Sequence, residues 1–155
     1  MIKVYIDADA CPVKDETFKV AGRYGLITYV VANQYLKVPL DVNIRMEAVS
    51  GDFDAADDWI AERAGENDIV ITSDLLLAER CVKNKVRVLG PKGNILDEDN
   101  IGSAVAGREI ATHLRDLGAS GTGPSAFEAK DRSNFLSKLD QVIQSLRKEL
   151  LTVKK

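Results

Sequence analysis

Two carboxylates stand at the end of the first apolar segment, in VYIDADACPV. Asp7 closes the apolar run and Asp9 follows two positions later. Carboxylates this close repel each other unless a cation or a proton compensates, which favours a metal site or an acid/base pair. The structural alternative is that Asp9 or Cys11 caps the following helix while Asp7 accepts backbone hydrogen bonds. We favour a functional role for Asp7, because capping needs no carboxylate at the strand end. Asp9 stays open between a ligand and a structural role.

A further carboxylate interrupts the apolar face of a predicted helix in GDFDAADDWIAERA. Asp57 shares that face, at spacings of three and four residues, with Phe53, Ala56, Ile60, Ala61 and Ala64. A buried, unpaired carboxylate is costly, so Asp57 should reach a cation, hydrogen-bond donors or a solvent-filled cleft. Favourable charge near a helix N-terminus is a sufficient explanation for Asp54. Asp58 is a candidate for a supporting role beside the site, and a solvated surface charge is the simpler interpretation.

The segment DIVITSDLLLAERC carries the last acidic candidate. An apolar strand runs into Thr72, Ser73 and Asp74 directly before a new helix. Taken alone, Asp74 is most simply an N-cap, while Thr72 and Ser73 are candidates for contacts to the carboxylates or to a substrate.

These carboxylates converge if the first and fourth strands are neighbours in a parallel sheet. Asp7, Asp9 and Asp74 would then meet at one edge of the sheet, with Asp57 projecting from the intervening helix. Such a cluster needs compensating cations, and carboxylate oxygens select hard cations such as Mg²⁺ or Mn²⁺. Metal-assisted attack of water on a phosphodiester is the natural reaction for this arrangement.

Basic side chains that could contact a phosphate are scattered along the chain. The candidates are Arg45, Arg80 and Arg132, and after them Lys14, Arg108 and Lys130. Each is alternatively a solvated or salt-bridged surface charge. Trp59 and Phe53 are most simply core residues, and the sequence shows no aromatic platform on which bases would stack.

Composition limits the class of protein. With 155 residues, 45% hydrophobic and 29% charged, the chain fits one globular domain, 1–155. Two cysteines and one histidine exclude sulfur-ligated structural zinc and His-rich zinc chemistry. A net charge of −3 and a pI of about 5.2 speak against a protein that coats nucleic acid through bulk positive charge. No segment approaches the roughly 18 apolar residues of a membrane helix and no signal-peptide layout is present, so we expect a cytoplasmic protein without membrane contact.

Strands and helices alternate along the chain. We expect strands near 2–6, 26–31, 44–49, 68–72 and 86–90, and helices near 13–23, 54–64, 75–83, 101–117 and 131–150. This alternation predicts a mostly parallel sheet with helices on both faces, an α/β three-layer doubly wound sandwich. Residues 118–132 are rich in glycine and small side chains, and are expected to form a loop before the C-terminal helix.

The segments DADACPVK, GDFDAADDWI, DIVITSDLLLA and GTGPSAFEAKDRSNFL resemble the bacterial YaiI/YqxD family over nearly the whole chain. That family is similar in fold to PIN-domain nucleases, so the resemblance implies a PIN-like fold. In those nucleases an Asp after the first strand, an acidic residue on a central helix and an Asp in a TSD context bind Mg²⁺ or Mn²⁺ for RNA cleavage. The resemblance carries these roles onto Asp7, Asp57 and Asp74. The DADACP turn departs from the usual PIN pattern of Asp followed by Thr or Ser and Asn.

Three functions stay open. The first is a metal-dependent endoribonuclease acting on single-stranded RNA, with Asp7, Asp57 and Asp74 as ligands and Asp9 as a ligand or orienter of metal-bound water. The second is a phosphatase, because VYIDADACPV also resembles the haloacid-dehalogenase DxD motif, with Asp7 as nucleophile and Asp9 as acid/base. Against it, the chain is short for that class and no Lys motif follows. The third is a non-catalytic RNA- or protein-binding module of PIN-like fold. The long last helix is a candidate homodimer interface.

Overall fold

A six-stranded sheet runs through the molecule in the order β3-β2-β1-β4-β5-β6. The computed structural model describes residues 1–9, 11–52, 54–118 and 126–153. Its strands are β1 (Lys3–Asp7), β2 (Ile27–Ala32), β3 (Ile44–Ala48), β4 (Ile69–Ile71), β5 (Arg87–Leu89) and β6 (Ile95–Leu96). Its helices are α1 (Lys14–Arg23), α2 (Ala55–Arg63), α3 (Leu75–Lys83), α4 (Ile101–Asp116) and α5 (Ala129–Val153).

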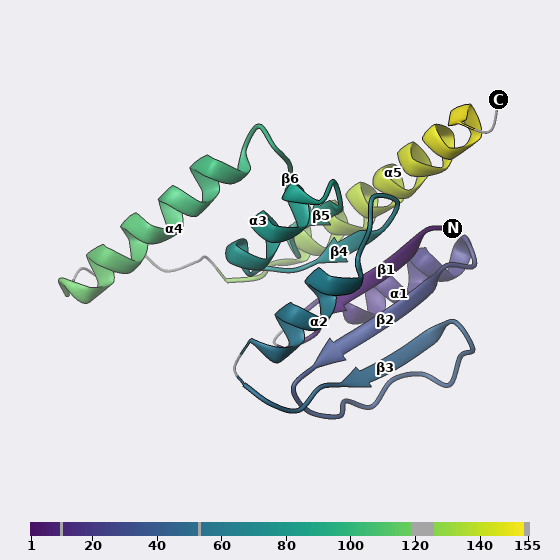
Figure 1. Cartoon of the computed structure of the whole chain (residues 1–155), viewed down its shortest axis with the longest axis horizontal. Helices are drawn as coiled ribbons and strands as arrows, with labels where there is room; N and C mark the ends of the chain where they lie inside the picture. The colour runs from purple at the N-terminus through teal and green to yellow at the C-terminus, as the bar shows by residue number, and fades with distance from the viewer. Residues whose placement is uncertain (10, 53, 119–125, 154–155) are drawn as a thin grey trace.

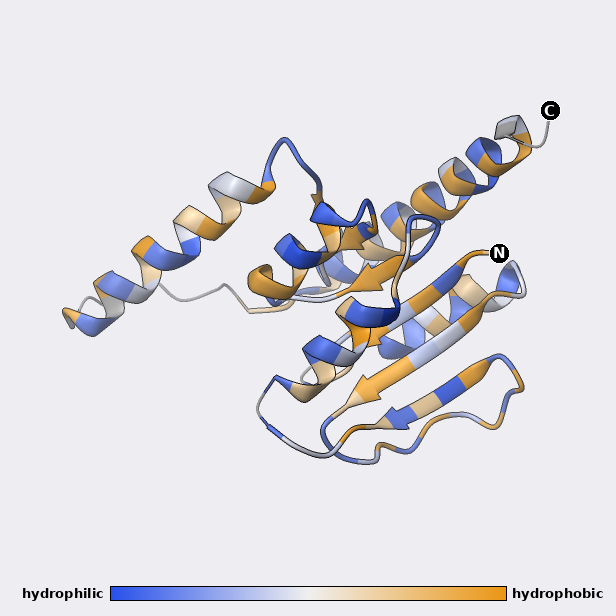
Figure 2. Cartoon of the chain, in the orientation of Figure 1, coloured by the Kyte–Doolittle hydropathy of each residue, from blue (hydrophilic) through white to orange (hydrophobic). Residues whose placement is uncertain are grey.

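Helices cover both faces of the sheet, which confirms the predicted α/β sandwich (Figure 1). Alternate residues of β1 point to opposite faces, as strand geometry requires. Val4 and Ile6 lie in a core with α1 and α5, whereas Tyr5 lies in a second core with α2, α3 and the start of α4. Figure 2 shows that the apolar residues concentrate in the central strands and on the helix faces that meet them. β4 is buried along its whole length, which explains its continuous apolar run.

β1 is the point of the sheet at which the strand order reverses. From β1 the chain proceeds outward to β2 and β3 on one side, and then returns to place β4 on the other side of β1. β1 and β4 are parallel neighbours, with Tyr5 opposite Val70 and Ile6 opposite Ile71. The condition that we set for convergence of the carboxylates is therefore met. Crevices at such reversal points, outside the carboxyl ends of the strands, are the usual ligand sites of open α/β sheets.

Two boundaries differ from the sequence prediction. The sequence showed no strand at β6, because two residues are too few for a periodic pattern; β6 pairs antiparallel with β5 after a turn at Gly93, whose φ is +88°. The C-terminal helix starts at Ala129, so residues 129–132 are helical rather than part of the predicted 118–132 loop. A reciprocal pair starts it there: Glu128 N–H donates to the Asp131 carboxylate, and Asp131 N–H donates to the Glu128 carbonyl. Residues 119–125 of that loop, and Phe53, lie outside the described residues.

The helices α4 and α5 extend beyond the sheet in opposite directions (Figure 1). α4 packs against α3 at its start, and further along it exposes Ile110 and Leu114, with the exposed Leu117 directly after its end. No helix in the described part of the chain combines the length and the apolar character needed to cross a membrane.

Candidate active site

Asp7 is the last residue of β1, and its side chain lies on the α2 and α3 side of the sheet, like Tyr5 two residues earlier. The Thr72 hydroxyl donates a hydrogen bond of 2.8 Å to Asp7 Oδ2. Burial raises the pKa of Asp7, the Thr72 hydrogen bond lowers it, and the charges of Asp74 and Asp9 raise it further. Asp7 is thus a partly buried carboxylate surrounded by other negative charges, as expected from its position.

Asp74 lies at the carboxyl end of the neighbouring strand and caps α3. Its Oδ1 accepts hydrogen bonds from the backbone N–H of Leu76 (2.9 Å) and of Leu77 (3.2 Å), which confirms the N-cap interpretation. Its own N–H donates to Thr72 Oγ1 at 2.9 Å. Thr72 therefore joins Asp7 and Asp74 through a single hydroxyl. Capping does not exclude a second role for Asp74, because a carboxylate has a second oxygen with free acceptor capacity.

Asp57 comes from the first turn of α2 and completes the carboxylate cluster, a name used here for Asp7, Asp57 and Asp74. Burial, followed by the charges of Asp7 and Asp74, raises the pKa of Asp57 from 3.8 to about 7. A hydrogen bond with the Asp74 carboxyl and the charge of Asp54 act in the same direction. These couplings show that side chains from β1, α2 and the β4–α3 junction meet at the point where strand order reverses. A proton on Asp57 partly offsets their mutual repulsion at neutral pH.

The carboxylate cluster has the donor chemistry of a hard-cation site, since carboxylate and hydroxyl oxygens suit Mg²⁺ or Mn²⁺. Burial and the charges of Asp7 and Asp74 raise the pKa of Asp57, and a cation bound there would relieve that repulsion. Among the residues that the structure describes, no three His, Cys, Asp or Glu side chains form a group arranged to hold a metal ion. Metal ligation by these residues therefore stays a prediction, and it requires Asp57 to exchange its hydrogen bond with Asp74 for the cation.

The other predicted residues lie around this cluster in different ways. Asp9 is exposed, and its Oδ2 accepts a hydrogen bond of 3.1 Å from the backbone N–H of Asn33, which ties the β1–α1 turn to the end of β2. Asp58 is exposed and forms an ion pair of 2.8 Å with Arg80, as the surface-charge interpretation expected. Ser73 is exposed beside Asp74. Asp9 still affects the site, because its charge contributes to the raised pKa of Asp7.

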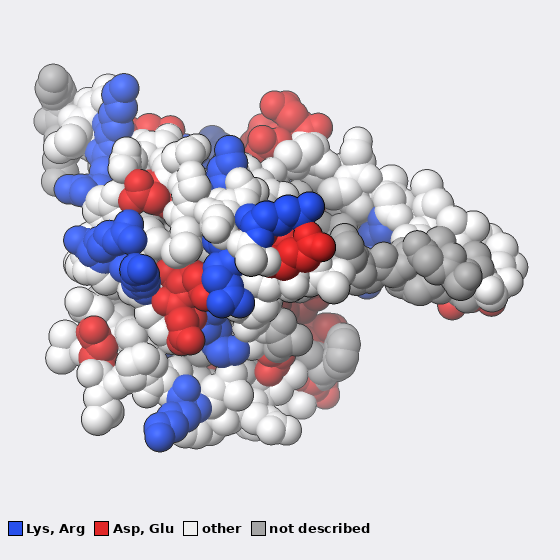
Figure 3. All heavy atoms as spheres, turned by 180° about the vertical axis from the view of Figure 1, so that it is seen from behind, with Lys and Arg blue, Asp and Glu red and all other residues white. Residues whose placement is uncertain are grey.

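Of the main basic candidates, only Arg80 lies at the carboxylate cluster. Asp58 and then the charge of Asp57 raise its pKa, so it stays a cation at the rim of the site. Arg132 pairs with Glu16 of α1 at 3.5 Å and lies over the Phe127 ring, on the opposite side of the sheet. Figure 3 shows that face, where basic and acidic side chains alternate rather than form one basic surface. Arg45 lies on β3, in a separate cavity.

That cavity contains the feature that sequence reasoning missed. Tyr5, Tyr29 and Trp59 form an aromatic group with ring centroids 5.1 to 6.1 Å apart, and Tyr29 and Trp59 are partly exposed. The sequence alone showed no aromatic platform, whereas the structure brings these three rings together. The group depends on the register that places Tyr5 beside Tyr29 across β1 and β2, which composition and spacing do not reveal. The available signal was a tyrosine at the third position of both KVYID and ITYVV.

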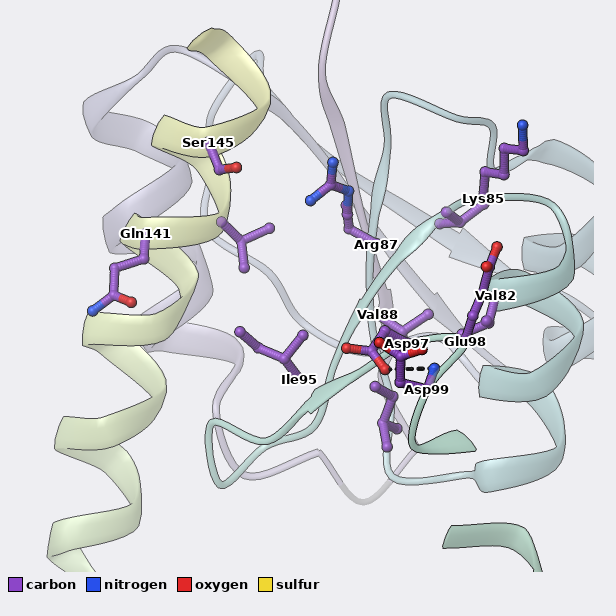
Figure 4. A pocket seen from close by; sticks show the side chains of 13 residues that line it. Val82, Lys85, Arg87, Val88, Ile95, Asp97, Glu98, Asp99, Gln141 and Ser145 are labelled. Carbon is purple, nitrogen blue, oxygen red and sulfur yellow. Dashed lines mark hydrogen bonds between the residues drawn. The ribbon is translucent and has the colours of Figure 1, made fainter. Parts of the chain in front are cut away.

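A second cavity, of about 510 Å³, lies away from the carboxylate cluster, between β5, β6 and α5. Figure 4 shows Lys85 and Arg87 among the lining residues, together with the acidic Asp97, Glu98 and Asp99 of the segment after β6. Arg87 is already paired with Glu149 at 2.6 Å. The lining of this cavity carries two basic and three acidic side chains, and it shares no residue with the carboxylate cluster.

The two cysteines are not placed for nucleophilic chemistry. Burial raises the pKa of the Cys11 thiol, and burial raises that of Cys81 to about 12. Both thiols therefore stay protonated near neutral pH, and the protonated form is a poor nucleophile.

Comparison with known sequences gives matches over nearly the whole chain. Residues 5–145 match the sequence model of a family described as "Uncharacterized BCR, YaiI/YqxD family". A "UPF0178 protein" of a Caulobacter species is 51% identical over 148 residues, covering 96% of this chain and 98% of the relative. Another of that name, from Rhodopseudomonas palustris, is 51% identical over 146 residues and covers 94% of each chain. No solved structure gives a significant match.

Proposed function

This chain belongs to the YaiI/YqxD family, and from that premise we propose that it is a metal-dependent nuclease that hydrolyses phosphodiester bonds of single-stranded RNA in the cytoplasm. The observation that carries the proposal is the convergence of three carboxylates, Asp7, Asp57 and Asp74, from β1, α2 and the β4–α3 junction, where neighbouring strands end. Burial and the charges of Asp7 and Asp74 raise the pKa of Asp57, and repulsion of this kind favours the binding of a cation. The resemblance to PIN-domain nucleases supports the same three residues.

Mg²⁺ or Mn²⁺ bound by Asp7, Asp57 and Asp74 would lower the pKa of a coordinated water and neutralise charge on the phosphate. Other side chains of the site would orient the ligands and attract the substrate. The Thr72 hydroxyl orients Asp7 and, through the Asp74 N–H, fixes the start of α3. Arg80 places a positive charge at the rim, where it attracts a phosphodiester. Asp9 lies one turn away as a candidate orienter of water, held by the Asn33 N–H.

The test combines Mn²⁺ titration calorimetry with cleavage of a labelled single-stranded RNA. Wild-type protein is compared with Asp7→Asn, Asp74→Asn and, as a matched control, Glu98→Gln, an exposed carboxylate in the other cavity. Asp74→Asn is informative because asparagine is an equally good N-cap, so the charge is removed while α3 keeps its cap. We expect both Asp variants to lose binding and cleavage together, and the control to retain both.

Other outcomes separate the competing functions. Mn²⁺ binding with a phosphorylated Asp7 after incubation with a phosphate monoester would replace the nuclease by the haloacid-dehalogenase-like phosphatase. Tight RNA binding that is unaffected by EDTA, without turnover, would favour the non-catalytic module. Absence of Mn²⁺ binding by wild-type protein would overturn the metal site itself.

A further inference from the structure

A cavity of about 410 Å³ lies between α2 and the β1–β3 part of the sheet, a size typical of small-ligand sites. It is called the α2 cavity below. It is lined by Lys3, Tyr5, Tyr29, Arg45, Glu47, Trp59 and Arg63. The strands contribute alternate residues of the face that also carries Asp7. The α2 cavity and the carboxylate cluster are therefore parts of one surface.

The α2 cavity offers aromatic faces to a flat ligand. Tyr5 and Tyr29 are stacked with ring centroids 5.1 Å apart, and Trp59 is tilted against both. Tyr5 is fully buried, and burial raises the pKa of its phenol to about 12, so it supports the group as a neutral ring. Tyr29 and Trp59 retain exposed surface. Aromatic rings of this kind stack on nucleobases with little preference for sequence.

The charge of the α2 cavity is positive, although the whole chain carries a net charge of −3. Lys3, Arg45 and Arg63 face a single acidic residue, Glu47. The Arg63 guanidinium lies 4.2 Å from the centroid of the Trp59 ring. No ion pair within the described residues involves the side chain of Lys3 or Arg45. Lys3 and Arg45 are therefore available to phosphates, whereas Arg63, Arg80 and Arg132 are already paired, with Glu62, Asp58 and Glu16.

Position links this cavity to the carboxylate cluster. Tyr5 precedes Asp7 by two residues on the same strand and face, a rise of roughly 7 Å. Asp57 and Trp59 both belong to α2, so one helix contributes to both the cluster and the cavity. In Figure 1 the helices of this side lie over the centre of the sheet and leave β3 at its open margin. Arg45 is accordingly exposed. A strand of nucleic acid whose phosphate reaches the cluster can therefore continue along the α2 cavity.

We propose that the α2 cavity binds a nucleotide of the single-stranded RNA substrate next to the bond that is cleaved, with the base against Tyr29 and Trp59 and the phosphates against Arg45 and Lys3. This inference rests on the proposed nuclease function. It adds a base-stacking subsite to a site that otherwise contacts only phosphate and metal. Because stacking is tolerant of base identity, the subsite favours single strands over paired ones rather than one sequence over another.

Trp59 is the single tryptophan of the chain, so its fluorescence reports on the α2 cavity alone. A short single-stranded oligoribonucleotide is titrated into the full-length protein in EDTA, where no cleavage occurs. We expect saturable quenching of Trp59 in wild-type protein and in the Asp7→Asn/Asp74→Asn variant. An RNA duplex of the same sequence should bind at least about tenfold more weakly, because its bases are already stacked.

Arg45→Ala is compared with Lys83→Ala, which removes an equal charge from an exposed position at the end of α3. We expect Arg45→Ala to weaken binding and to reduce the slope of log K against log salt by about 0.7, the value for one phosphate contact in single strands, while Lys83→Ala leaves both unchanged. Trp59→Leu, followed by anisotropy of labelled RNA, should weaken binding about 5- to 150-fold.

Three results would overturn the assignment of the α2 cavity: no quenching by RNA, equal effects of Arg45→Ala and Lys83→Ala, or equal quenching by an acidic peptide. Should RNA quench Trp59 while Mn²⁺ never supports cleavage, the nuclease proposal fails and the RNA subsite stands. Should cleavage depend on Asp7 yet be unaffected by Arg45→Ala and Trp59→Leu, the nuclease stands and the subsite fails.

Discussion

At the scale of single residues, protonation of Asp57 adjusts the net charge of the carboxylate cluster. Its pKa is raised from 3.8 to about 7, first by burial and then by Asp7 and Asp74. The folded chain thus holds this proton more tightly than the unfolded chain does. The contribution of the protonated group to stability is complete below pH 3.8, falls as pH rises, and is lost once pH passes about 7.

Asp57→Asn should therefore stabilise the metal-free protein at pH 8 while abolishing Mn²⁺ binding. Discounted for solvent screening of this partly exposed group, we expect a gain of about 1 kcal/mol, or roughly 2–4 °C in Tm, that disappears near pH 4. Thermal melts in EDTA between pH 4 and 8 measure it, with Asp58→Asn as the exposed neighbouring control. A variant that is less stable than wild type at pH 8 would contradict the assigned repulsion.

Thr72 is the second decisive residue, because it is buried and its hydroxyl joins two carboxylates. Thr72→Val removes the hydrogen bond that lowers the pKa of Asp7, so that pKa should rise and Mn²⁺ binding should move to higher pH. A hydrogen bond to a charged group contributes about 1.5–3 kcal/mol, so we expect affinity at pH 7 to fall about tenfold or more. Calorimetry across pH measures the shift. Thr72→Ser restores the hydroxyl and should restore the profile; equal behaviour of the Val and Ser variants would exclude this role.

At the scale of elements, α3 depends on the same side chain as the site. Asp74→Ala removes the acceptor of the Leu76 and Leu77 N–H groups and should cost about 1 kcal/mol, or roughly 2–4 °C in Tm. Asp74→Asn keeps the cap, and we expect it to melt at or above the wild-type temperature while losing Mn²⁺ binding. Thermal melts of the two variants side by side separate structure from function. Equal melting temperatures would show that the cap contributes nothing.

The elements that sequence reasoning located well are those with a local signal. Helix 75–83 was predicted with its observed bounds, because a capping residue precedes an uninterrupted apolar pattern. Asp7 and Asp74 were found because a carboxylate directly after a buried strand is a local pattern. β6, the start of α5 and the grouping of Tyr5, Tyr29 and Trp59 were missed. Each of these depends on partners remote in sequence or on very few residues, such as the pairing of Leu89 with Ile95.

At the scale of the whole molecule, α4 extends beyond the sheet (Figure 1) and exposes apolar side chains. Ile110, Leu114 and Leu117 repeat at helical spacing and are 61%, 38% and 69% exposed. Contiguous exposed apolar surface of this kind marks an interaction face, and a self-complementary one gives a dimer with two-fold symmetry. For the homodimer predicted from the sequence, this face of α4 is therefore a further candidate interface beside α5.

Light scattering after size exclusion tests this assignment. We expect dimers of wild-type protein and monomers of an Ile110→Glu/Leu117→Glu variant with an unchanged melting temperature, since neither side chain is in the core. Glu109→Lys, on the same helix, is the control for surface charge and should remain dimeric. A wild-type monomer at every concentration would end the assignment.

The two edge strands of the sheet bear on the tendency of the protein to aggregate. The unpaired backbone groups of an edge strand can pair with a strand of another molecule. Natural proteins limit such pairing by shortening the edge strand or by placing charges on it. One edge strand, β6, is two residues long. The other, β3, carries Arg45 and Glu47 among its five residues. Arg45, which we assign to RNA binding, and Glu47 thus also protect the chain from aggregation, so replacing both by valine should cause fibrous association before it causes unfolding.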